Sequence, residues 1–438
     1  MLLTATLGGR APGPAPGLAP GATGEPTGPG VPAGASAGPG GASPAGSASP
    51  TPGTSASPGS SPSASPGQTP SGDPRPAPTV ASWLPFLLDA RLAELRSLSG
   101  IPGLSVTILF RDGTRWTGVG GQADVAGAVP VRPGTSFAIA SISKTFTAAL
   151  VLALVEEGRL TLEEAAVPRL AGVSGVTIDR RITIAQLLNH TSGLRDFLLE
   201  PKIEPAFAAD PDAAWAPAQS FAYVGRPLAA PGERFFYSNT NYLLLGLIAE
   251  RVTGQPMAVN LRARFFEPLG LRTASYQSAE VPRLPLAHGY RFTTGLATEA
   301  PILIPSATGV VPFNAVVTAA GGAGSVAAAS PDIAAWARAL YVGRVLQAST
   351  VTRMLDDAAR TKALDPAQPY GHGVQVVAVD GHPSFGHSGR YLGARSVVRH
   401  FPLEGLTIAV LTNQSRTDPT DILIDLLRLV LAGQPPAS

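Results

Sequence analysis

Apolar and polar positions change rhythm along the chain, and each change marks a predicted element. Trp83 to Leu98 repeats leucine, phenylalanine and alanine at helical spacing and ends before Gly100. The next two runs, Leu104 to Phe110 and Thr114 to Val119, are apolar or β-branched. They flank Asp112-Gly113, a pattern typical of a β-hairpin. The pattern therefore predicts a helix followed by a hairpin.

The middle of the sequence is mostly helical by the same criterion. Its predicted helices share apolar residues at spacings of three and four, and they cover 144–157, 182–188, 241–252 and 256–266. A further helix opens at Ser330-Pro331-Asp332 and carries Trp336 to Leu340. Serine caps helices and proline fits their first turn, so this boundary is well marked.

The C-terminal part turns to strands, with β character in 373–379, 394–400 and 406–412. Thr420 is placed to cap a final helix that runs to Ala432. The short N-terminal strands need partners, and these C-terminal strands are available. The pattern thus predicts an α/β (α+β) fold: one antiparallel sheet from both chain ends, flanked by helices, with an inserted helical lobe. Ligands tend to bind between such lobes.

Composition divides the chain of 438 residues into unlike parts. Between positions 11 and 80, 63 of 70 residues are Pro, Gly, Ala, Ser or Thr. Such a segment cannot bury enough apolar surface to offset the entropy of ordering it. We therefore predict a disordered tract at 1–80, a folded domain at 81–433 (sheet lobe about 81–140 and 320–433, helical lobe about 141–319) and a tail at 434–438.

Other totals narrow the possible functions. The chain has no Cys, and its six His form no pair at metal-ligand spacing, so we expect no metal and no cofactor. The net charge is +2 without a Lys/Arg run, which argues against nucleic acid as a partner. The longest uncharged stretch, 301–331, is interrupted by proline and paired glycines and is not a membrane span. A small-molecule or peptide substrate remains, and the oligomeric state is undetermined.

Targeting has two interpretations. Met1 to Gly9 is mildly apolar but too short for a signal-peptide core. A Pro/Ser/Thr/Gly tract ahead of a folded domain is nevertheless a common tether of exported proteins. We expect an extracytoplasmic protein, secreted or in the cell envelope, whose true start lies upstream of Met1. The alternative is a cytoplasmic protein with a disordered tail.

The first element with chemistry is Ser141-Ile142-Ser143-Lys144, at the start of helix 144–157. Residues three apart share a helix face, so the Ser141 hydroxyl and the Lys144 amine can approach each other. Serine needs a base to become a nucleophile. The apolar run Phe146 to Val155 can desolvate the amine and depress its pKa. The alternative is a helix cap at Ser141 and a surface charge at Lys144.

The second element, Tyr237-Ser238-Asn239, precedes a predicted helix. Tyrosine can relay a proton, and its ionised form is favoured between cations. Asparagine offers both a donor and an acceptor to a substrate amide. The alternative is a half-buried Tyr237 beside a helix-capping Ser238 or Asn239.

The third element is Gly386-His387-Ser388-Gly389-Arg390, just before the predicted strand 394–400. Small residues let a substrate lie close to the backbone, as an added strand. His387 can carry a charge or donate a hydrogen bond. The alternative is a loop turn without chemistry.

Together the three elements resemble the serine β-lactamase-related hydrolases. That family includes class C β-lactamases, D-alanyl-D-alanine carboxypeptidases, D-aminopeptidases and esterases of the same fold. Its pattern is S-x-x-K, then Y-x-N, then K-T-G or H-x-G, and here it reads Ser141-x-x-Lys144, Tyr237-x-Asn239 and His387-x-Gly389. The resemblance covers about residues 84 to 432. Flanking stretches that also match the family are 137–140, 187–194, 231–235, 320–325 and 370–373.

The resemblance implies catalytic roles for four residues. Ser141 is the acylated nucleophile, and Lys144 and Tyr237 share the proton transfers. His387 orients the tyrosine and the acyl or carboxylate end of the substrate. The implied fold is two-lobed, as the strand order also predicts, and no metal or cofactor is implied.

The resemblance also implies binding roles. Asn239 touches the substrate amide, and Ser388, Gly389 and Arg390 line the substrate strand. The backbone N–H groups of Ser141 and Arg390 form an oxyanion hole. The Arg390 side chain stands where relatives often have Gly, Thr or Ser, and it either clamps a substrate carboxylate, fills the pocket or points to solvent.

The predicted function is a serine hydrolase that acts through an acyl-enzyme on a peptide or ester acyl group. His387 replaces the lysine usual in class C β-lactamases, which favours an enzyme like the D-alanyl-D-alanine carboxypeptidases or D-aminopeptidases, with a peptidoglycan-derived peptide as one candidate substrate. The alternatives are an esterase of β-lactamase fold, a weak β-lactamase, and a catalytically silent cell-envelope binding module.

Overall fold

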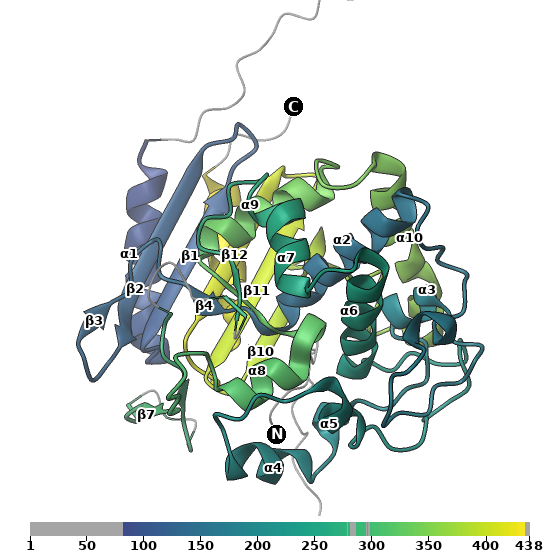
Figure 1. Cartoon of the computed structure of the whole chain (residues 1–438). Helices are drawn as coiled ribbons and strands as arrows, with labels where there is room; N and C mark the ends of the chain where they lie inside the picture. The colour runs from purple at the N-terminus through teal and green to yellow at the C-terminus, as the bar shows by residue number, and fades with distance from the viewer. Residues whose placement is uncertain (1–81, 278, 281–285, 295, 297, 434–438) are drawn as a thin grey trace, which may run out of the picture. The chain divides into compact units, whose positions relative to one another are not determined.

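The structure is a computed structural model that describes residues 82–277, 279–280, 286–294, 296 and 298–433 (Figure 1). The predicted tract 1–80 and the tail 434–438 lie outside the described residues. Their predicted disorder, and the division of 81–433 into two lobes, stay predictions.

An antiparallel sheet joins the two ends of the described chain, as predicted (Figure 1). Its seven strands stand in the order β3-β2-β1-β12-β11-β10-β9. They are β1 (Gly103–Leu109), β2 (Arg115–Asp124), β3 (Val129–Pro130), β9 (Gln375–Val379), β10 (His382–Tyr391), β11 (Ala394–Phe401) and β12 (Leu406–Thr412). The β1–β2 hairpin turns at Asp112-Gly113 as expected, and β1 pairs with β12 from the other side.

Helices cover both faces of this sheet, and strand periodicity explains how. In β1, Leu104, Val106 and Ile108 share a core with α1 (Leu84–Ser99) and α11 (Pro419–Ala432). The alternate residues Ser105 and Thr107 point to the opposite face. There both hydroxyls bond the Ser330 hydroxyl of α9 (Ser330–Tyr341), at 2.7 and 2.8 Å. The sheet is therefore a central layer buried on each side.

Most of the remaining helices gather on the side of the sheet away from β3, whereas the short strand β7 lies near β3 (Figure 1). The helices are α2 (Ser143–Glu156), α3 (Ile184–Leu188), α4 (Ile203–Ala209), α5 (Pro217–Phe221), α6 (Asn239–Thr253), α7 (Met257–Leu261), α8 (Asn314–Ala320) and α10 (Ala348–Leu364). Short strands are β4 (Phe137–Ala138), β5 (Ser275–Tyr276), β6 (Tyr290–Arg291), β7 (Ile302–Leu303) and β8 (Val326–Ala328). Among the described residues, no helix combines the length and the apolar character needed to cross a membrane.

Several boundaries differ from the predicted ones. The final helix is capped by Asp418, whose carboxylate accepts from the Thr420 N–H, because aspartate competes better for that position. The helix predicted at 256–266 is α7 followed by a π-helical turn, Arg262–Phe266. The helix α10 was not predicted, since few large apolar residues mark its buried side.

The third chemical element lies inside strand β10, not in a loop ahead of a strand. His387, Ser388 and Gly389 lack the β-branched side chains that reveal a strand in sequence. Pairing with β11 imposes the extended conformation, as with Gly389 opposite Ser396. The sheet thus decides the conformation that local propensity leaves open.

The fold carries a testable dependence of stability on pH at His400. Its imidazole is buried on β11, and Nδ1 lies 2.9 Å from the Thr407 hydroxyl. Burial lowers the pKa of His400 to about 4, against about 6.5 for an unfolded chain. Below pH 6.5 the unfolded state takes up a proton that the folded state refuses. The stability due to a neutral His400 is thus present above pH 6.5 and lost as pH falls towards 4.

We expect the difference in unfolding free energy between the wild type and His400→Gln to shrink over that same pH range. Urea denaturation at pH 7.5 and at pH 4.5 measures this difference. Thr407→Val is the control, since it keeps the imidazole and should keep the pH dependence. A difference that stays constant with pH would contradict the assignment.

Candidate active site

The Ser141 hydroxyl sits in a tight turn between the sheet and α2. Ala140–Ile142 form a 3-10 turn that leads directly into the helix. Ala140 adopts a left-handed φ of 47°, a strained conformation for a residue with a side chain. The N-cap of α2 is Ile142, so Ser141 is not the helix cap that the alternative interpretation proposed. The turn instead presents Ser141 to the side chains that converge on it.

The Lys144 amine is fully buried in the first turn of α2. Its Nζ lies 3.0 Å from Ser141 Oγ, 2.7 Å from Asn239 Oδ1 and 2.8 Å from the Ala323 carbonyl oxygen. A surface lysine, the alternative interpretation, is therefore excluded. Burial lowers the pKa of Lys144 to about 7, and the Asp196 carboxylate opposes that shift. The amine can then lose its proton near neutral pH.

Tyr237 enters from the extended segment before α6. The centre of its ring lies 5.0 Å from Lys144 Nζ. Its hydroxyl is buried and makes no hydrogen bond of ordinary geometry within the described residues. Burial raises the pKa of Tyr237 well above its usual value, and the neighbouring Ser141 hydroxyl opposes the rise. The phenol is therefore neutral, in contrast to the ionised form considered from the sequence.

Asn239 begins α6 and connects Lys144 to a second buried charge. Its Oδ1 accepts from Lys144, and its Nδ2 donates to Asp196 Oδ2 at 2.7 Å. The other Asp196 oxygen, Oδ1, accepts from the Leu198 N–H at 3.0 Å. Burial raises the pKa of Asp196 above its usual range. Both ends of the Asn239 amide are thus engaged within the protein.

His387 lies on β10, fully buried, with both ring nitrogens close to other groups. Nδ1 lies 2.6 Å from the Ser388 carbonyl oxygen, and Nε2 lies 2.9 Å from the Tyr370 hydroxyl. Burial first, and then the Lys144 cation, lower the pKa of His387 well below its usual value. A neutral imidazole that donates from Nδ1 and accepts at Nε2 satisfies both contacts. Its ring centre is 6.3 Å from that of Tyr237.

Gly389 brings the Ser141 turn against the sheet. A Cβ atom at this position would lie 2.2 Å from the Ile139 carbonyl oxygen and 2.4 Å from Ser396 Oγ, so only glycine fits. Ser396 also donates to that same carbonyl at 2.8 Å. The glycine of the third element therefore fixes the distance between β10 and the nucleophile turn.

The neighbours of Gly389 are more exposed. The Ser388 N–H donates to Gln375 Oε1 at 3.1 Å, and the buried Arg399 donates to the same oxygen at 2.6 Å. Arg390 is half-buried, and its guanidinium lowers the pKa of Arg395, itself lowered mainly by burial. Within the described residues the Arg390 side chain has no hydrogen-bond or ion-pair partner.

Three residues that contact the buried cluster were not identified as site residues from the sequence: Asp196, His190 and Tyr370. His190 accepts from the Ser238 N–H at 3.1 Å, and its ring centre lies 4.2 Å from that of Tyr237. Asp196 stands just beyond a flanking stretch that matched the family pattern, directly ahead of the apolar run 197–199. An acidic residue at the start of an apolar run was the sequence signal that could have indicated a buried carboxylate at Asp196. Tyr370 lies within another such stretch, but nothing local showed its partner to be His387.

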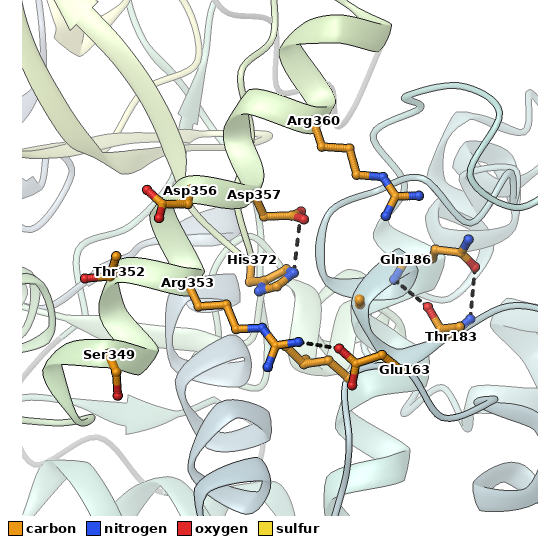
Figure 2. Close-up of a pocket in the computed structure, with 12 residues that line it drawn as sticks. Glu163, Thr183, Gln186, Ser349, Thr352, Arg353, Asp356, Asp357, Arg360 and His372 are labelled. Carbon is orange, nitrogen blue, oxygen red and sulfur yellow. Dashed lines mark hydrogen bonds and ion pairs between the residues drawn. The ribbon is translucent and has the colours of Figure 1, made fainter. Parts of the chain in front are cut away.

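A separate cavity of about 540 Å³ lies between α10 and the segment that leads into α3 (Figure 2). Its lining includes none of the predicted site residues. Figure 2 shows Arg353 directed to Glu163 and His372 directed to Asp357, and His372 Nε2 lies 3.4 Å from Asp357 Oδ2. Asp357 also accepts from Asn189 at 2.7 Å. Burial lowers the pKa of His372, so the Arg353–Glu163 contact is an ion pair and the His372–Asp357 contact is not.

Comparison with known proteins gives consistent matches. The family described as Beta-lactamase matches residues 88–432. Penicillin-binding protein 4 of Amycolatopsis lactamdurans is 31% identical over 78% of this chain and 88% of its own length. A D-aminopeptidase of Brucella anthropi is 26% identical over 75% of this chain. The chain spans only 59% of that relative.

Among solved structures, a D-stereospecific amidohydrolase from Streptomyces sp. superposes with a TM-score of 0.65 at 26% identity. The superposition covers 80% of this chain and 98% of that one. The matched family span contains every residue of the buried cluster, from Ser141 to His387.

Proposed function

The chain belongs to the beta-lactamase family of serine hydrolases, and from this premise we propose that Ser141 is its acylated nucleophile and Lys144 the base that activates it. One observation carries the proposal: the buried Lys144 amine lies 3.0 Å from Ser141 Oγ while two other acceptors fix its orientation. Activation of a serine by a positioned base is the usual requirement for acyl transfer.

The two acceptors direct the lone pair of a neutral Lys144. A neutral amine has two N–H bonds and one lone pair. Asn239 Oδ1 and the Ala323 carbonyl can only accept, so they take the two N–H bonds. The lone pair then faces Ser141, whose O–H donates to it. This geometry supports Lys144 as the general base.

The proposed reaction has two acyl transfers. Ser141 Oγ forms a bond to the carbonyl carbon as its proton passes to Lys144, and the carbonyl becomes an oxyanion. The backbone N–H groups of Ser141 and Arg390 are proposed to stabilise that oxyanion. The leaving amine or alcohol departs with the proton and leaves an ester on Ser141. Water then attacks the acyl carbon as its proton passes to Lys144. The bond from that carbon to Ser141 Oγ breaks, Oγ takes the proton from Lys144, and the acid leaves.

Tyr237 is proposed to hand the proton from Lys144 to the leaving group. Its neutral phenol suits a relay better than a base, since burial disfavours the phenolate. His387 is proposed to hold Tyr370 beside Tyr237, through the 2.9 Å contact between Nε2 and the Tyr370 hydroxyl. We propose that Asn239 also contacts the substrate amide, whose N–H would donate to the second lone pair of Asn239 Oδ1.

We expect Tyr237→Phe to lower kcat/KM by about 10²-fold or more, because it removes only the relaying hydroxyl. The variant should retain the fold, since within the described residues this buried hydroxyl makes no hydrogen bond of ordinary geometry. Steady-state kinetics with an activated amide measures the loss. Tyr341→Phe is the matched control, because its hydroxyl is also buried without such a bond. Equal rates in the two variants would contradict the relay.

The substrate is proposed to be an amide or peptide of a D-amino acid. Support comes from the relatives, a D-aminopeptidase and a D-stereospecific amidohydrolase. Arg390, half-exposed on β10, is proposed to bind a substrate carboxylate, with Ser388 and Gly389 lining the same strand. A carboxylate next to the scissile bond is found in D-alanyl-D-alanine peptides, so a peptidoglycan-derived peptide fits this arrangement.

A side-by-side substrate panel tests this choice. It contains the p-nitroanilides of D-alanine and L-alanine, a D-Ala-D-Ala peptide, a p-nitrophenyl ester and a chromogenic cephalosporin. We expect the D-anilide or the D-peptide to give the highest kcat/KM. A preference for the L-anilide would overturn the stereochemical assignment, and activity on the ester alone would indicate the esterase function.

We also propose an extracytoplasmic location. The composition of residues 11–80 and the likeness to a penicillin-binding protein support it. Fractionation of cells that express the native locus tests it, and an entirely cytosolic signal would overturn it.

A further inference from the structure

Asp196 is a buried acid that is connected to the proposed base, Lys144, through the side chain of Asn239. No step of the reaction above uses it. It lies just ahead of the short 3-10 turn Phe197–Leu199, where Oδ1 accepts from the Leu198 N–H. Its side chain is buried, with only 4% of the residue exposed. Its other oxygen faces Asn239, whose carbonyl in turn faces Lys144. The three side chains thus form one hydrogen-bonded series that ends at Ser141.

We propose that Asp196 is a positioning residue that orients the Asn239 amide, so that Lys144 keeps its lone pair for Ser141. This inference rests on the proposed function of Lys144 and Ser141.

The hydrogen-bond inventory supports this role. A carboxylate only accepts, so the amide group nearest Asp196 must be the NH₂ of Asn239. The Asn239 carbonyl is then left to face Lys144 and takes one of its N–H bonds. If the amide turned over, its NH₂ would face Lys144, and the lone pair of the neutral amine would accept from Asn239 in place of Ser141. A donor-only contact at that position would remove the base.

The charge of Asp196 has a second effect, which opposes the first because it favours the protonated form of Lys144. Lys144 is faced by Asp196, by Tyr237 and Tyr242 from the α6 segment, by His190 from its turn, and by His387 from β10. Burial keeps both imidazoles neutral by lowering the pKa of each. Asp196 is therefore the group whose negative charge favours the protonated amine. Loss of that charge should make Lys144 easier to deprotonate.

Asp196→Asn separates orientation from bulk because it is isosteric. The new amide can satisfy the Leu198 N–H only by turning its own NH₂ towards Asn239. Asn239 then turns over, and its NH₂ occupies the lone pair of Lys144. We expect kcat/KM on p-nitrophenyl acetate at pH 8 to fall by about tenfold or more, as small misplacements of reacting groups do. The acid limb of its pH profile should move to lower pH.

The double variant Asp196→Asn with Asn239→Asp provides the rescue. The carboxylate, now at position 239, accepts from Lys144 and from the NH₂ of the amide, now at position 196. The carbonyl of that amide accepts from the Leu198 N–H, so every hydrogen bond of the series is restored in this exchange. We expect kcat/KM at pH 8 to recover above that of Asp196→Asn. Because the carboxylate now touches Lys144, the acid limb should move to higher pH than in the wild type.

Recovery of kcat/KM in the exchanged pair is the signature of positioning, because the two displacements of the acid limb also follow from the place of the carboxylate charge alone. The proposal is overturned if Asp196→Asn matches the wild type in rate and profile, or if the exchange fails to recover activity while thermal unfolding shows both variants folded. If Asp196→Asn does not fold, Asn239→Asp alone replaces it as the reference, since its carboxylate faces that of Asp196, and the exchanged pair should exceed it in kcat/KM at pH 8. Asp380→Asn is the matched control, since it removes an exposed partner of Arg428 at the β9–β10 turn and should change neither quantity.

These outcomes differ from a failure of the proposed function. If the wild type acquires no acyl group on Ser141, the proposed mechanism is wrong. If the wild type is acylated and Asp196→Asn changes neither the rate nor the pH profile, only the positioning role is wrong.

Discussion

We expect a Ser141→Ala variant to hydrolyse the best substrate of the panel more slowly than the wild type, by a factor on the order of 10⁴ or larger. Loss of the catalytic nucleophile has such an effect in other serine hydrolases. The reason is chemical, because no acyl-enzyme can form without the Ser141 oxygen. Lys144 would keep its contacts with Asn239 and Ala323, so the fold should persist. Initial rates measure the loss, and circular dichroism checks the fold.

Mass spectrometry supplies the direct readout. The wild type, mixed briefly with an activated ester, should gain the mass of one acyl group on the peptide that contains Ser141. Ser143→Ala is the matched control from the same turn, since the Ser143 hydroxyl accepts from the Val326 N–H and not from Lys144. That control should lose stability but keep the acylation. Undiminished hydrolysis by Ser141→Ala would refute the enzyme mechanism.

A Lys144→Met variant is expected to lose about 10²-fold or more in kcat/KM, the usual effect of removing a general base. Methionine fills similar space in this fully buried position and cannot accept a proton. The wild-type pH profile should fall as pH drops below about 7, because the pKa of Lys144 lies near 7 and the protonated amine is no base. In Lys144→Met that acid limb should be absent.

Burst kinetics with p-nitrophenyl acetate over pH 5 to 9 measures both effects. The sequence has two further lysines, Lys202 and Lys362, and both are exposed. Lys362→Met is the control and should retain the rate and the limb of the wild type. A Lys144→Met variant that keeps the wild-type acid limb would assign that limb to another group.

Part of this site was accessible from spacing alone. Ser141 and Lys144 lie three residues apart at the start of an apolar helix, so their proximity follows from helix geometry. The burial of Lys144 follows from the same apolar run. The union of the two chain ends in one sheet followed from strands that lacked local partners, and the β1–β12 pairing confirms it.

Other features had no local cause and were missed. The strand conformation of His387 to Gly389 is imposed by β11, and α10 carries too few large apolar residues to show as a helix. The ring contact of His190 with Tyr237 and the hydrogen bond between Tyr370 and His387 join segments that no sequence spacing relates.

Residue identity and helical period are local properties, so the amino-acid order alone specifies which reactive groups are present and which are neighbours along a helix. How those groups are protonated and oriented depends on packing. Lys144 is oriented by partners 95 and 179 positions away, Asn239 and the Ala323 carbonyl. Its pKa depends on the water excluded around it, and both effects arise only when distant segments pack together.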